Sequence, residues 1–395
     1  MAIPFLGVFS SLMNRKLLLP IAALVLLLAL ATVWWVSRLS PGVGKAGGTP
    51  TAGVAPGGSS SVRKTARAPS PVAAQLDAIR ARLQASKDPQ ANRQILAELR
   101  AMLDALPPGV ASREVQSFLA SVKDAATQLN VTIEPGGGLG DASSLRVFLL
   151  DYLGRIDRPA AGAVAAQILA RYTTPDEWAV SLRNYAWANS GADAETFLQA
   201  KVRELLGNPA WAKDPSAGFL EAFDAIVYAH GTALTPELAA FVRDRDNRAT
   251  SHAAYLTLDR LTITEPASML KQLVDQPELM NGREQTRANL LARADVRDPG
   301  QRALVEQYLL DPSRDPAELA TFAGLYPNAN YMISNNLLTT VETPNRGQLA
   351  AYDREALKII EQWQQDPRFE RLQPLLTQIH ERLANFVGQA AGGVP

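Results

Sequence analysis

Cysteine is absent from this chain of 395 residues. The absence excludes disulfide bonds, iron–sulfur clusters, thiolate zinc sites and a cysteine nucleophile. Histidine is scarce too: His230, His252 and His380 lie too far apart in the sequence to form the i, i+4 pair that binds zinc from one helix. We expect each of them at a helix end or on the surface, and we assign no catalytic, metal or cofactor-binding role to any of them.

Acidic residues are missing from positions 1–72, a segment that contains seven of the 39 basic residues. The remainder of the chain therefore holds 32 basic and 39 acidic residues, which gives it a net charge of about −7 at neutral pH. A neutral total thus conceals a basic N-terminal segment and an acidic folded part. Because nucleic-acid binding depends on positive charge, the sequence predicts no nucleic-acid partner.

Positions 17–36 form a run of twenty uncharged and almost entirely apolar residues. Twenty such residues are enough for a helix to cross a bilayer. Arg15 and Lys16 precede the run, and Trp34 and Trp35 stand where an interfacial aromatic belt is expected. The sequence therefore predicts a short N-terminal segment, residues 1–16, followed by a single transmembrane helix, residues 17–36, that contacts the lipid bilayer directly.

The charges around this run give only a slight preference of orientation. Arg15 and Lys16 before it are nearly balanced by Arg38 and Lys45 after it, and the short leading segment then favours an N-terminus in the cytoplasm. This orientation predicts a bacterial-type inner-membrane protein whose folded part lies outside the cytoplasm. The alternative is a secreted protein made by signal cleavage near Ala31, because a small-x-small pattern follows the apolar residues.

Periodicity along the rest of the chain is helical almost everywhere, and alternating strand patterns are almost absent. Residues 145–153 show it clearly, with apolar side chains at i, i+3, i+4, i+7 and i+8. Helix starts recur as Thr or Asp followed by Pro, a pair that satisfies the first amides without losing a hydrogen bond. These pairs are Asp88-Pro89, Thr174-Pro175, Asp214-Pro215, Thr235-Pro236, Asp298-Pro299, Asp315-Pro316 and Asp366-Pro367. The sequence therefore predicts an all-α fold class.

Two of these starts carry a glutamate three residues after the cap. Glu177 follows Thr174 in this way, and Glu318 follows Asp315. The spacing is that of a capping box, in which the glutamate side chain accepts a hydrogen bond from the backbone amide of the capping residue.

Composition and periodicity together predict the domain organisation. Residues 37–71 are rich in Gly, Pro and Ser and are expected to be a disordered linker. The expected segments after it are an N-terminal helical hairpin or cap (72–130), a Gly-rich hinge (131–140), helical repeats (141–342), a C-terminal helix pair (343–388) and a disordered tail (389–395).

A faint internal repeat with an offset of 81 residues supports the helical-repeat segment. Residues 237–241, Glu-Leu-Ala-Ala-Phe, recur as Glu-Leu-Ala-Thr-Phe at 318–322. An asparagine lies six residues after each Phe, and we expect a further helix after each, the second of them containing Asn336 and Leu337. The offset is close to twice the 40–47 residues of a two-helix unit. Phe241 and Phe322 are then predicted to occupy equivalent core positions.

Residues 246–258 and 157–169 each combine an Asp or Arg turn with a helix that has small residues at packing positions. On these residues the chain resembles the HEAT-like family of α-solenoids over positions 141–342. The resemblance implies a right-handed α-solenoid of stacked antiparallel helix pairs, in which each unit covers its neighbour's apolar face. It also implies a scaffold that binds other proteins and has no catalytic residues.

A glycine-rich loop at 135–140 offers the one arrangement that could cradle a phosphate, if a strand at 131–134 precedes it and a helix starts at Asp141. The spacing fits neither the dinucleotide nor the P-loop fingerprint, no lysine follows, and a hinge is the favoured interpretation. Ser251, His252 and Asp246 lie close in sequence, but adjacent helical residues point in different directions, which disfavours a Ser-His-Asp relay.

Two further groups of side chains are candidates for binding. Trp178, Leu182 and Tyr185 share one helical face, which favours a core position over a sugar-stacking platform. Amide side chains gather near the end of the repeats, and such residues can line a groove in a helical repeat protein. The candidate binding surface consists of Asn328, Asn330, Asn335 and Asn336.

No motif in the chain specifies a reaction. The favoured hypothesis is a membrane-anchored, extracytoplasmic helical-repeat scaffold that binds an envelope protein, performs no catalysis and needs no cofactor. The alternative is an all-α envelope enzyme, similar to an α/α-toroid, that acts on polysaccharide. Such an enzyme needs acids and His, Tyr or Arg gathered in one deep pocket.

Overall fold

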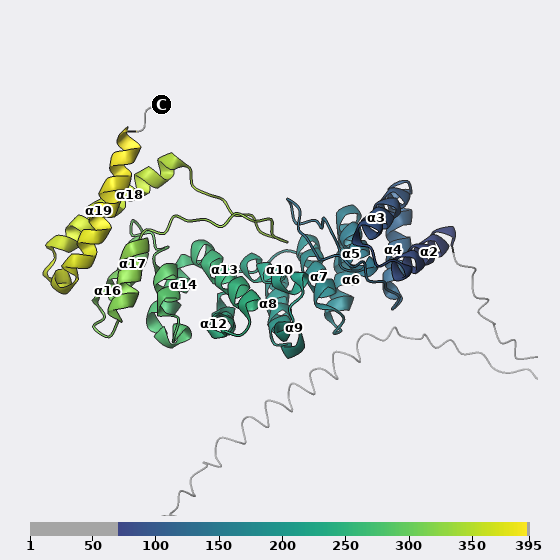
Figure 1. Ribbon diagram of the computed structural model, residues 1–395, viewed down its shortest axis with the longest axis horizontal. Helices are drawn as coiled ribbons and strands as arrows, with labels where there is room; N and C mark the ends of the chain where they lie inside the picture. Colours follow the sequence, from purple (N-terminus) through teal and green to yellow (C-terminus); the bar gives the residue numbers. More distant parts are fainter. Residues whose placement is uncertain (1–69, 393–395) are drawn as a thin grey trace, which may run out of the picture. The chain divides into compact units, whose positions relative to one another are not determined.

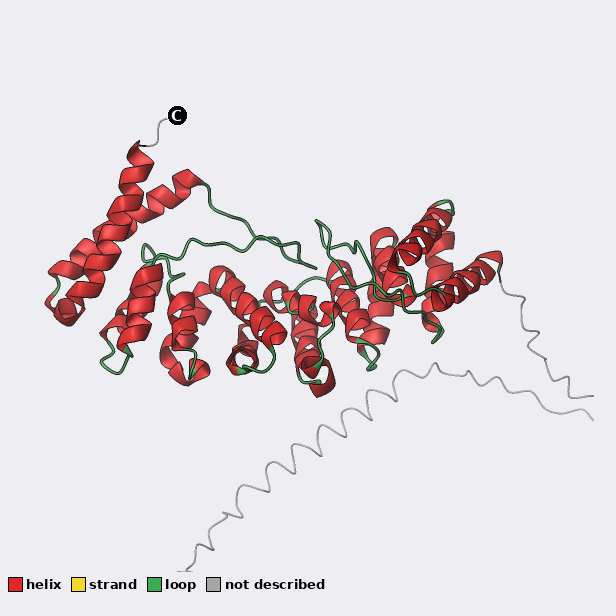
Figure 2. Ribbon diagram, viewed as in Figure 1, coloured by secondary structure: helices red, strands yellow, loops and turns green. Residues whose placement is uncertain are grey.

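The computed structural model describes residues 70–392, which belong to one compact unit, residues 67–395. These residues form an all-α fold, as predicted (Figure 2). Within residues 70–392 no β-strand occurs, and the nearest equivalents are two isolated bridges, Ala126–Ser144 and Ile133–Leu139. The same range contains no helix that is both long and apolar enough to cross a membrane. The predicted transmembrane helix at 17–36 and the cleavage site near Ala31 lie outside the described residues.

Most of the helices follow one another with short connections, and the two long connections are residues 121–144 and 326–345 (Figure 1). Their bounds in chain order are α2 (Pro71–Ala85), α3 (Pro89–Asp104), α4 (Pro108–Ala120), α5 (Leu145–Ile156), α6 (Arg158–Leu169), α7 (Pro175–Ala188), α8 (Ala192–Leu206), α9 (Pro209–Lys213), α10 (Ala217–Glu221), α11 (Asp224–Tyr228), α12 (Thr235–Arg243), α13 (Arg248–Thr264), α14 (Pro266–Asp275), α15 (Glu284–Leu291), α16 (Pro299–Leu310), α17 (Pro316–Leu325), α18 (Arg346–Gln365) and α19 (Gln373–Gly392). Three 3₁₀ turns accompany them: η1 (Thr232–Leu234), η2 (Pro277–Met280) and η3 (Pro367–Leu372).

Packing joins helices that are near neighbours in the chain. One row of contacts passes from α5 to α7, then to α10 and α11, α13, α15, α17 and α19, and a second set of helices packs beside this row (Figure 1). Helix α19 continues to Gly392, past the predicted start of a disordered tail at residue 389. Helix α2 begins at Pro71, which was the last residue of the predicted linker.

The Thr/Asp-Pro starts are confirmed where the first residue caps an α-helix. Asp88, Thr174, Asp298 and Asp315 each accept a hydrogen bond from an amide of the first turn, and Asp366 does the same for η3. The polar side chain replaces the missing partner of a free N–H group, so the local sequence alone determines these starts.

Two predicted starts are wrong. Asp214 is the C-cap of α9, and the next helix begins after Ser216, whose hydroxyl accepts from the amide of Phe219. Thr235 is the first residue of α12 and not its cap, because η1 already turns the chain before it. For Thr235 the preceding 3₁₀ turn supplies the hydrogen-bond partner that a capping side chain otherwise supplies, whereas for α10 the capping role falls to Ser216 and not to Asp214.

The apolar positions predicted for residues 145–153 are confirmed as core. However, α5 is buried on every side, and the buried residues include the charged Arg146 and Asp151. The periodicity of the apolar residues does not distinguish a helix that is surrounded by other helices from one that is half exposed, because both have an apolar stripe. Its buried charges must be paired, and their partners define the site described below.

The 81-residue repeat does not describe the structure. Phe322 is fully buried, whereas Phe241 is only partly buried at the edge of the core. No helix forms at Asn336-Leu337, and residues 327–345 have no regular secondary structure. We call this segment the arm. A connection of this length without its own secondary structure is uncommon in a compact unit and often has a function.

Candidate binding surface

Three buried aspartate–arginine pairs link successive helices of the row. Asp151 of α5 binds Arg183 of α7, Asp224 of α11 binds Arg260 of α13, and Asp259 of α13 binds Arg293, which follows the C-cap of α15. The partners in these pairs are 32, 36 and 34 residues apart in the sequence. We call these three pairs the ladder.

Burial of the ladder is nearly complete at both of its ends. The side chains of Asp151 and Arg183 are 1% and 0% exposed, with an Oδ1–Nη1 distance of 2.7 Å. Burial lowers the pKa of the Arg183 guanidinium, and the nearby charge and hydrogen bond of Asp151 oppose this shift. Asp259 and Arg293 form a bidentate pair with two distances of 2.8 Å. Buried charges of this kind are tolerated because each has both a counter-charge and hydrogen bonds.

A second type of pair lies at the N-terminal ends of the same helices. Arg146 binds Glu177, and Arg287 binds Glu318, both with a separation of 31 residues. The predicted capping boxes at Thr174 and Asp315 are therefore incomplete: the caps form, but the glutamates pair with an arginine of the preceding row helix. Burial acts to lower the pKa of Arg287, but the hydrogen bond and charge of Glu318 outweigh it and raise the pKa.

The first pair of the ladder is covered by a tight turn, residues 131–140, which we call the turn. Arg183 donates to the carbonyl of Gly137 at 2.7 Å, and Asp151 accepts from the amide of Leu139 at 3.0 Å. The amide of Glu134 donates to the carbonyl of Gly138 at 2.8 Å, which closes the turn on itself. The next helix starts at Leu145 and not at Asp141, so the arrangement needed for a phosphate cradle does not form.

The other two pairs of the ladder are covered by the arm. Arg293 donates to the carbonyls of Asn328 and Asn330, at 2.9 and 2.5 Å. Asp224 accepts from the amides of Leu338 and Thr339, at 2.6 and 2.9 Å, and from the Thr339 hydroxyl. In Figure 2 the arm is the long stretch of green loop that leaves α17, runs toward the middle of the row and returns to α18. Every one of these contacts except the hydroxyl uses main-chain atoms of the arm.

The four asparagines of the predicted binding surface all belong to the arm. Asn328 bonds to Asn289 of α15 through its side chain, and Asn335 donates to the carbonyl of Ile133 in the turn. Asn336 bonds only within the arm, to Ser334 and Thr339, and the side chain of Asn330 has an exposed position. The asparagines thus belong to the segment that covers the row of helices, and the surface beneath it is formed by the ladder.

Two cavities lie beside the first residues of the arm. One of about 250 Å³ lies between the arm and helices α13 and α15, and includes Tyr255, Asn289 and Met332 in its lining. The other, of about 380 Å³, lies between the arm and α18, and both ends of the arm reach it through Asn328 and Pro344. The two ends of the arm therefore lie close together.

The histidines lie apart from one another. His230 is largely exposed with its Nδ1 2.5 Å from Glu265, His252 is exposed, and His380 lies 3.5 Å from Glu361. Among residues 70–392 no group of His, Asp and Glu is arranged to hold a metal ion. The hydroxyl of Ser251 donates to the carbonyl of Val242, so it is not aligned with His252 for nucleophilic chemistry.

The predicted core position of the aromatic residues is confirmed for Trp178. It is 1% exposed and donates to the carbonyl of Arg171 at 2.8 Å, while Tyr172 stacks on its ring at a centroid distance of 5.6 Å. Leu182 is fully buried, and Tyr185 is partly buried against Phe197.

Comparisons with protein-family models, with curated proteins and with solved structures find no match to this chain. The structure itself therefore defines the candidate site, and sequence reasoning missed its central residues. The available signal was the recurrence of Asp and Arg on successive helices at intervals of 32 to 36 residues. That signal emerges only when the helices of one row are known to be neighbours.

Proposed function

We propose that this chain is a membrane-anchored helical-repeat scaffold that binds a protein partner outside the cytoplasm and performs no catalysis. The anchor is the apolar run at 17–36, and the binding element is the folded unit beyond it. The observation that carries the proposal is that the ladder already holds an extended polypeptide segment, the arm, chiefly through main-chain atoms.

Repeat architecture is supported by the ion pairs between successive row helices. Five such pairs recur at intervals of 31 to 36 residues, and the same Arg-to-Glu geometry appears at both ends of the row. We infer an α-solenoid of stacked antiparallel helix pairs, right-handed as in the resemblance noted above. Its unit is shorter than the 40–47 residues of HEAT repeats. Solenoids of this kind expose one extended surface, which suits the binding of a polypeptide.

The alternative, an all-α enzyme acting on envelope polysaccharide, requires two carboxylates that are free to act on a glycosidic bond. Asp151, Asp224 and Asp259 are the buried acids of the ladder, and each binds an arginine. Carboxylates held in this way are structural elements in the scaffold interpretation. Release of soluble sugar from envelope polysaccharide by the purified full chain would favour the enzyme instead.

Site-specific photo-crosslinking in the full chain tests the scaffold. A photoreactive residue at Ile333, which is exposed on the arm, is expected to capture an envelope protein of one defined mass. The matched control is the same residue at Val122, which is 97% exposed after α4 and outside the ladder. Equal capture from both positions, or none from either, would contradict specific binding at this surface.

Membrane anchoring has its own test. Full-length protein is expected to remain in the membrane fraction after carbonate washing and to retain an N-terminal tag, because twenty apolar residues hold the helix in lipid. A mature N-terminus at Thr32 would support the secreted alternative and leave the binding surface unaffected.

A further inference from the structure

We propose that residues 331–343 of the arm occupy the binding track of an extended segment from another polypeptide, which replaces them on the row of helices. The inference deepens the proposed function, because it names the partner's chemistry and the step that admits it. The partner is a segment in extended conformation that presents an aliphatic side chain where Leu337 lies and a Thr or Ser hydroxyl where Thr339 lies.

The recognition elements on the row of helices are general for polypeptides. Asp224 accepts hydrogen bonds from two successive amides of the arm and from one hydroxyl, and Arg260 balances its charge. Any extended chain has such amides, so replacing the arm requires no complementary charge. Selectivity then depends on the hydroxyl and on one apolar side chain, since bonds to a buried charge are strong and directional.

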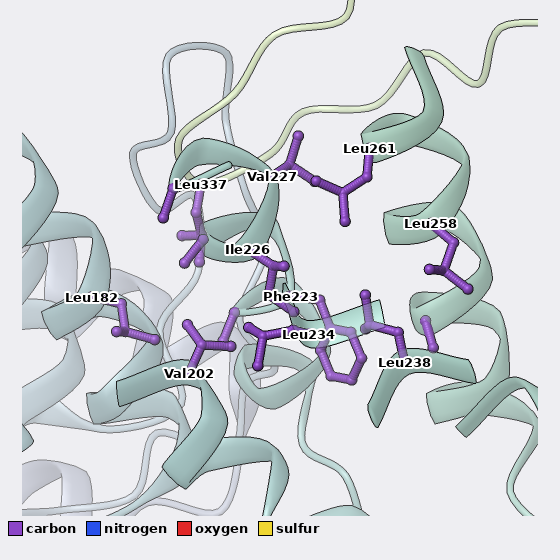
Figure 3. Close-up of a cluster of buried hydrophobic side chains, with 14 of the residues drawn as sticks. Leu182, Val202, Phe223, Ile226, Val227, Leu234, Leu238, Leu258, Leu261 and Leu337 are labelled. Atoms are coloured by element: carbon purple, nitrogen blue, oxygen red, sulfur yellow. The ribbon is translucent and has the colours of Figure 1, made fainter. Parts of the chain in front are cut away.

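Leu337 provides the apolar contact. It is 1% exposed and belongs to the same buried cluster as Leu182 of α7 and Ile226 and Val227 of α11 (Figure 3). Every other residue of the range 328–345 is partly or fully exposed. Beyond Pro327, the arm is therefore fixed to the row by one buried side chain, the partly buried Leu338 beside it and a few hydrogen bonds, which is the anchoring mode of a bound peptide.

The geometry of the arm permits its release without rearrangement of the helices. Both of its ends border the same cavity of about 380 Å³, and residues 328–330 stay fixed by Arg293 and by the carbonyl of Ala292. Met332 and Ile333, in the part of the arm that leads away from α17, are 52% and 76% exposed. Exposed apolar side chains next to an occupied track provide additional surface for an incoming chain.

The first experiment uses the full chain with residues 331–343 replaced by a short Gly-Ser link. The probe is a fluorescent peptide with the sequence of residues 335–343, and its binding is measured by anisotropy. The peptide is expected to bind the shortened chain and to bind the wild-type chain more weakly, because the wild-type arm competes for the same track.

Two peptide variants give a matched control. Thr339→Val removes the hydroxyl that donates to Asp224, whereas Thr340→Val makes the same change at an exposed neighbour. The first is expected to weaken binding about tenfold, and the second to leave it unchanged. Equal binding of the two variants, or no binding to a shortened chain that keeps its helical circular dichroism, would overturn the proposal.

A second variant keeps the test decisive if the shortened chain fails to fold. The chain contains no native cysteine, so Asn335→Cys and Glu134→Cys introduce the only thiols, one on the arm and one on the turn that it contacts. A short thiol crosslinker should then hold the arm on the row and abolish peptide binding, with binding retained in the uncrosslinked double variant. Undiminished binding after crosslinking would overturn the proposal.

The two proposals fail in different ways. If the locked arm still allows capture of an envelope protein from Ile333, the scaffold remains supported but the partner does not use the arm's track. If the peptide binds as expected while no envelope protein is captured, the track exists but the proposed scaffold function is contradicted.

Discussion

The turn and the arm cover neighbouring parts of the same ladder, but they are held there by different means. The turn closes on itself through short-range hydrogen bonds, and its contact with Asp151 spans only 12 residues. The arm reaches Asp224 across more than 110 residues of sequence. Closing a short turn costs less conformational entropy than holding a long connection in one position.

This difference indicates which of the two segments stays in place in the folded protein and which can be released. The turn contributes the buried Leu139 and Val131 to the core, whereas residues 328–345 of the arm contribute one buried side chain, Leu337, and the partly buried Leu338. Loss of the turn therefore exposes core, while loss of the arm exposes one side-chain site and a few hydrogen-bonding groups. The turn acts as part of the folded unit, and the arm acts as a ligand that is covalently attached.

The largest expected effect is on stability, and it distinguishes the ion pair beneath the turn from the ion pair of Asp224 beneath the arm. Asp151→Asn leaves Arg183 without its charge partner in a fully buried position, and we expect the free energy of unfolding to fall by about 3–5 kcal/mol. Asp224→Asn should cost about half as much, because Arg260 is 16% exposed and release of the arm admits water. Urea unfolding followed by circular dichroism measures both, and equal losses would contradict the distinction.

The second prediction concerns the point where the two covers touch. Gly137 has a φ of +81°, and a Cβ atom there would lie 2.1 Å from the carbonyl oxygen of Leu337. Gly137→Ala is expected to cost about 2–4 kcal/mol, since the strain of a left-handed residue adds to this clash. Gly136→Ala is the control, with a φ of +84° but open space around it, and should cost only about 1 kcal/mol. Equal costs in urea unfolding would mean that the contact with the arm carries no energy.

The features that the sequence predicted are those with local causes. The all-α class follows from periodicity, and the starts of α3, α7, α16 and α17 follow from Asp or Thr followed by Pro. A capping side chain acts on amides two or three residues away, so the pattern needs no knowledge of the fold. The anchor at 17–36 and the partner remain predictions.

The features that the sequence missed depend on tertiary neighbours. Glu318 has capping-box spacing, but its partner Arg287 lies 31 residues earlier on another helix. The segment around Asn336 resembled a repeat of α13, yet it extends along the row because Asp224 and Arg293 satisfy its main chain. Hydrogen-bond partners of this kind replace those of a helix, and no local pattern encodes them.

The third prediction tests how independently the arm is held. Leu337→Ala removes the buried side chain in the middle of the arm, and we expect faster hydrogen exchange at the amides of Leu338 and Thr339 with little change elsewhere. The loss of global stability should be about 2 kcal/mol or less, at the low end for a buried Leu, because the row persists when the arm leaves. Ile333→Ala is the control and should change neither quantity, since this side chain is 76% exposed. Unchanged protection in Leu337→Ala would show that the arm is held as firmly as the turn.

The smallest expected effect concerns Glu221, a carboxylate near the arm-covered pair of Asp224 and Arg260. Burial raises the pKa of Glu221, and the charge of Asp224 raises it further while Arg260 opposes the shift. Because the pKa is higher in the folded state than in the unfolded chain, the folded state binds more protons between the two values. The contribution of Glu221 to stability is therefore greatest below the ordinary glutamate pKa of about 4.3 and is lost as the pH rises through the raised value.

Glu221→Gln removes this cost, so at pH 7 the variant should be more stable than the wild type by less than about 1 kcal/mol. The two proteins should converge in acid, where Glu221 is neutral in both the folded and the unfolded state. The control is Glu237→Gln on α12, whose carboxylate pairs with Arg203 at 2.9 Å on the surface and should give no gain. Urea unfolding at several pH values measures the difference, and a gain that persists unchanged in acid would show that burial of the charge at Glu221 is not its cause.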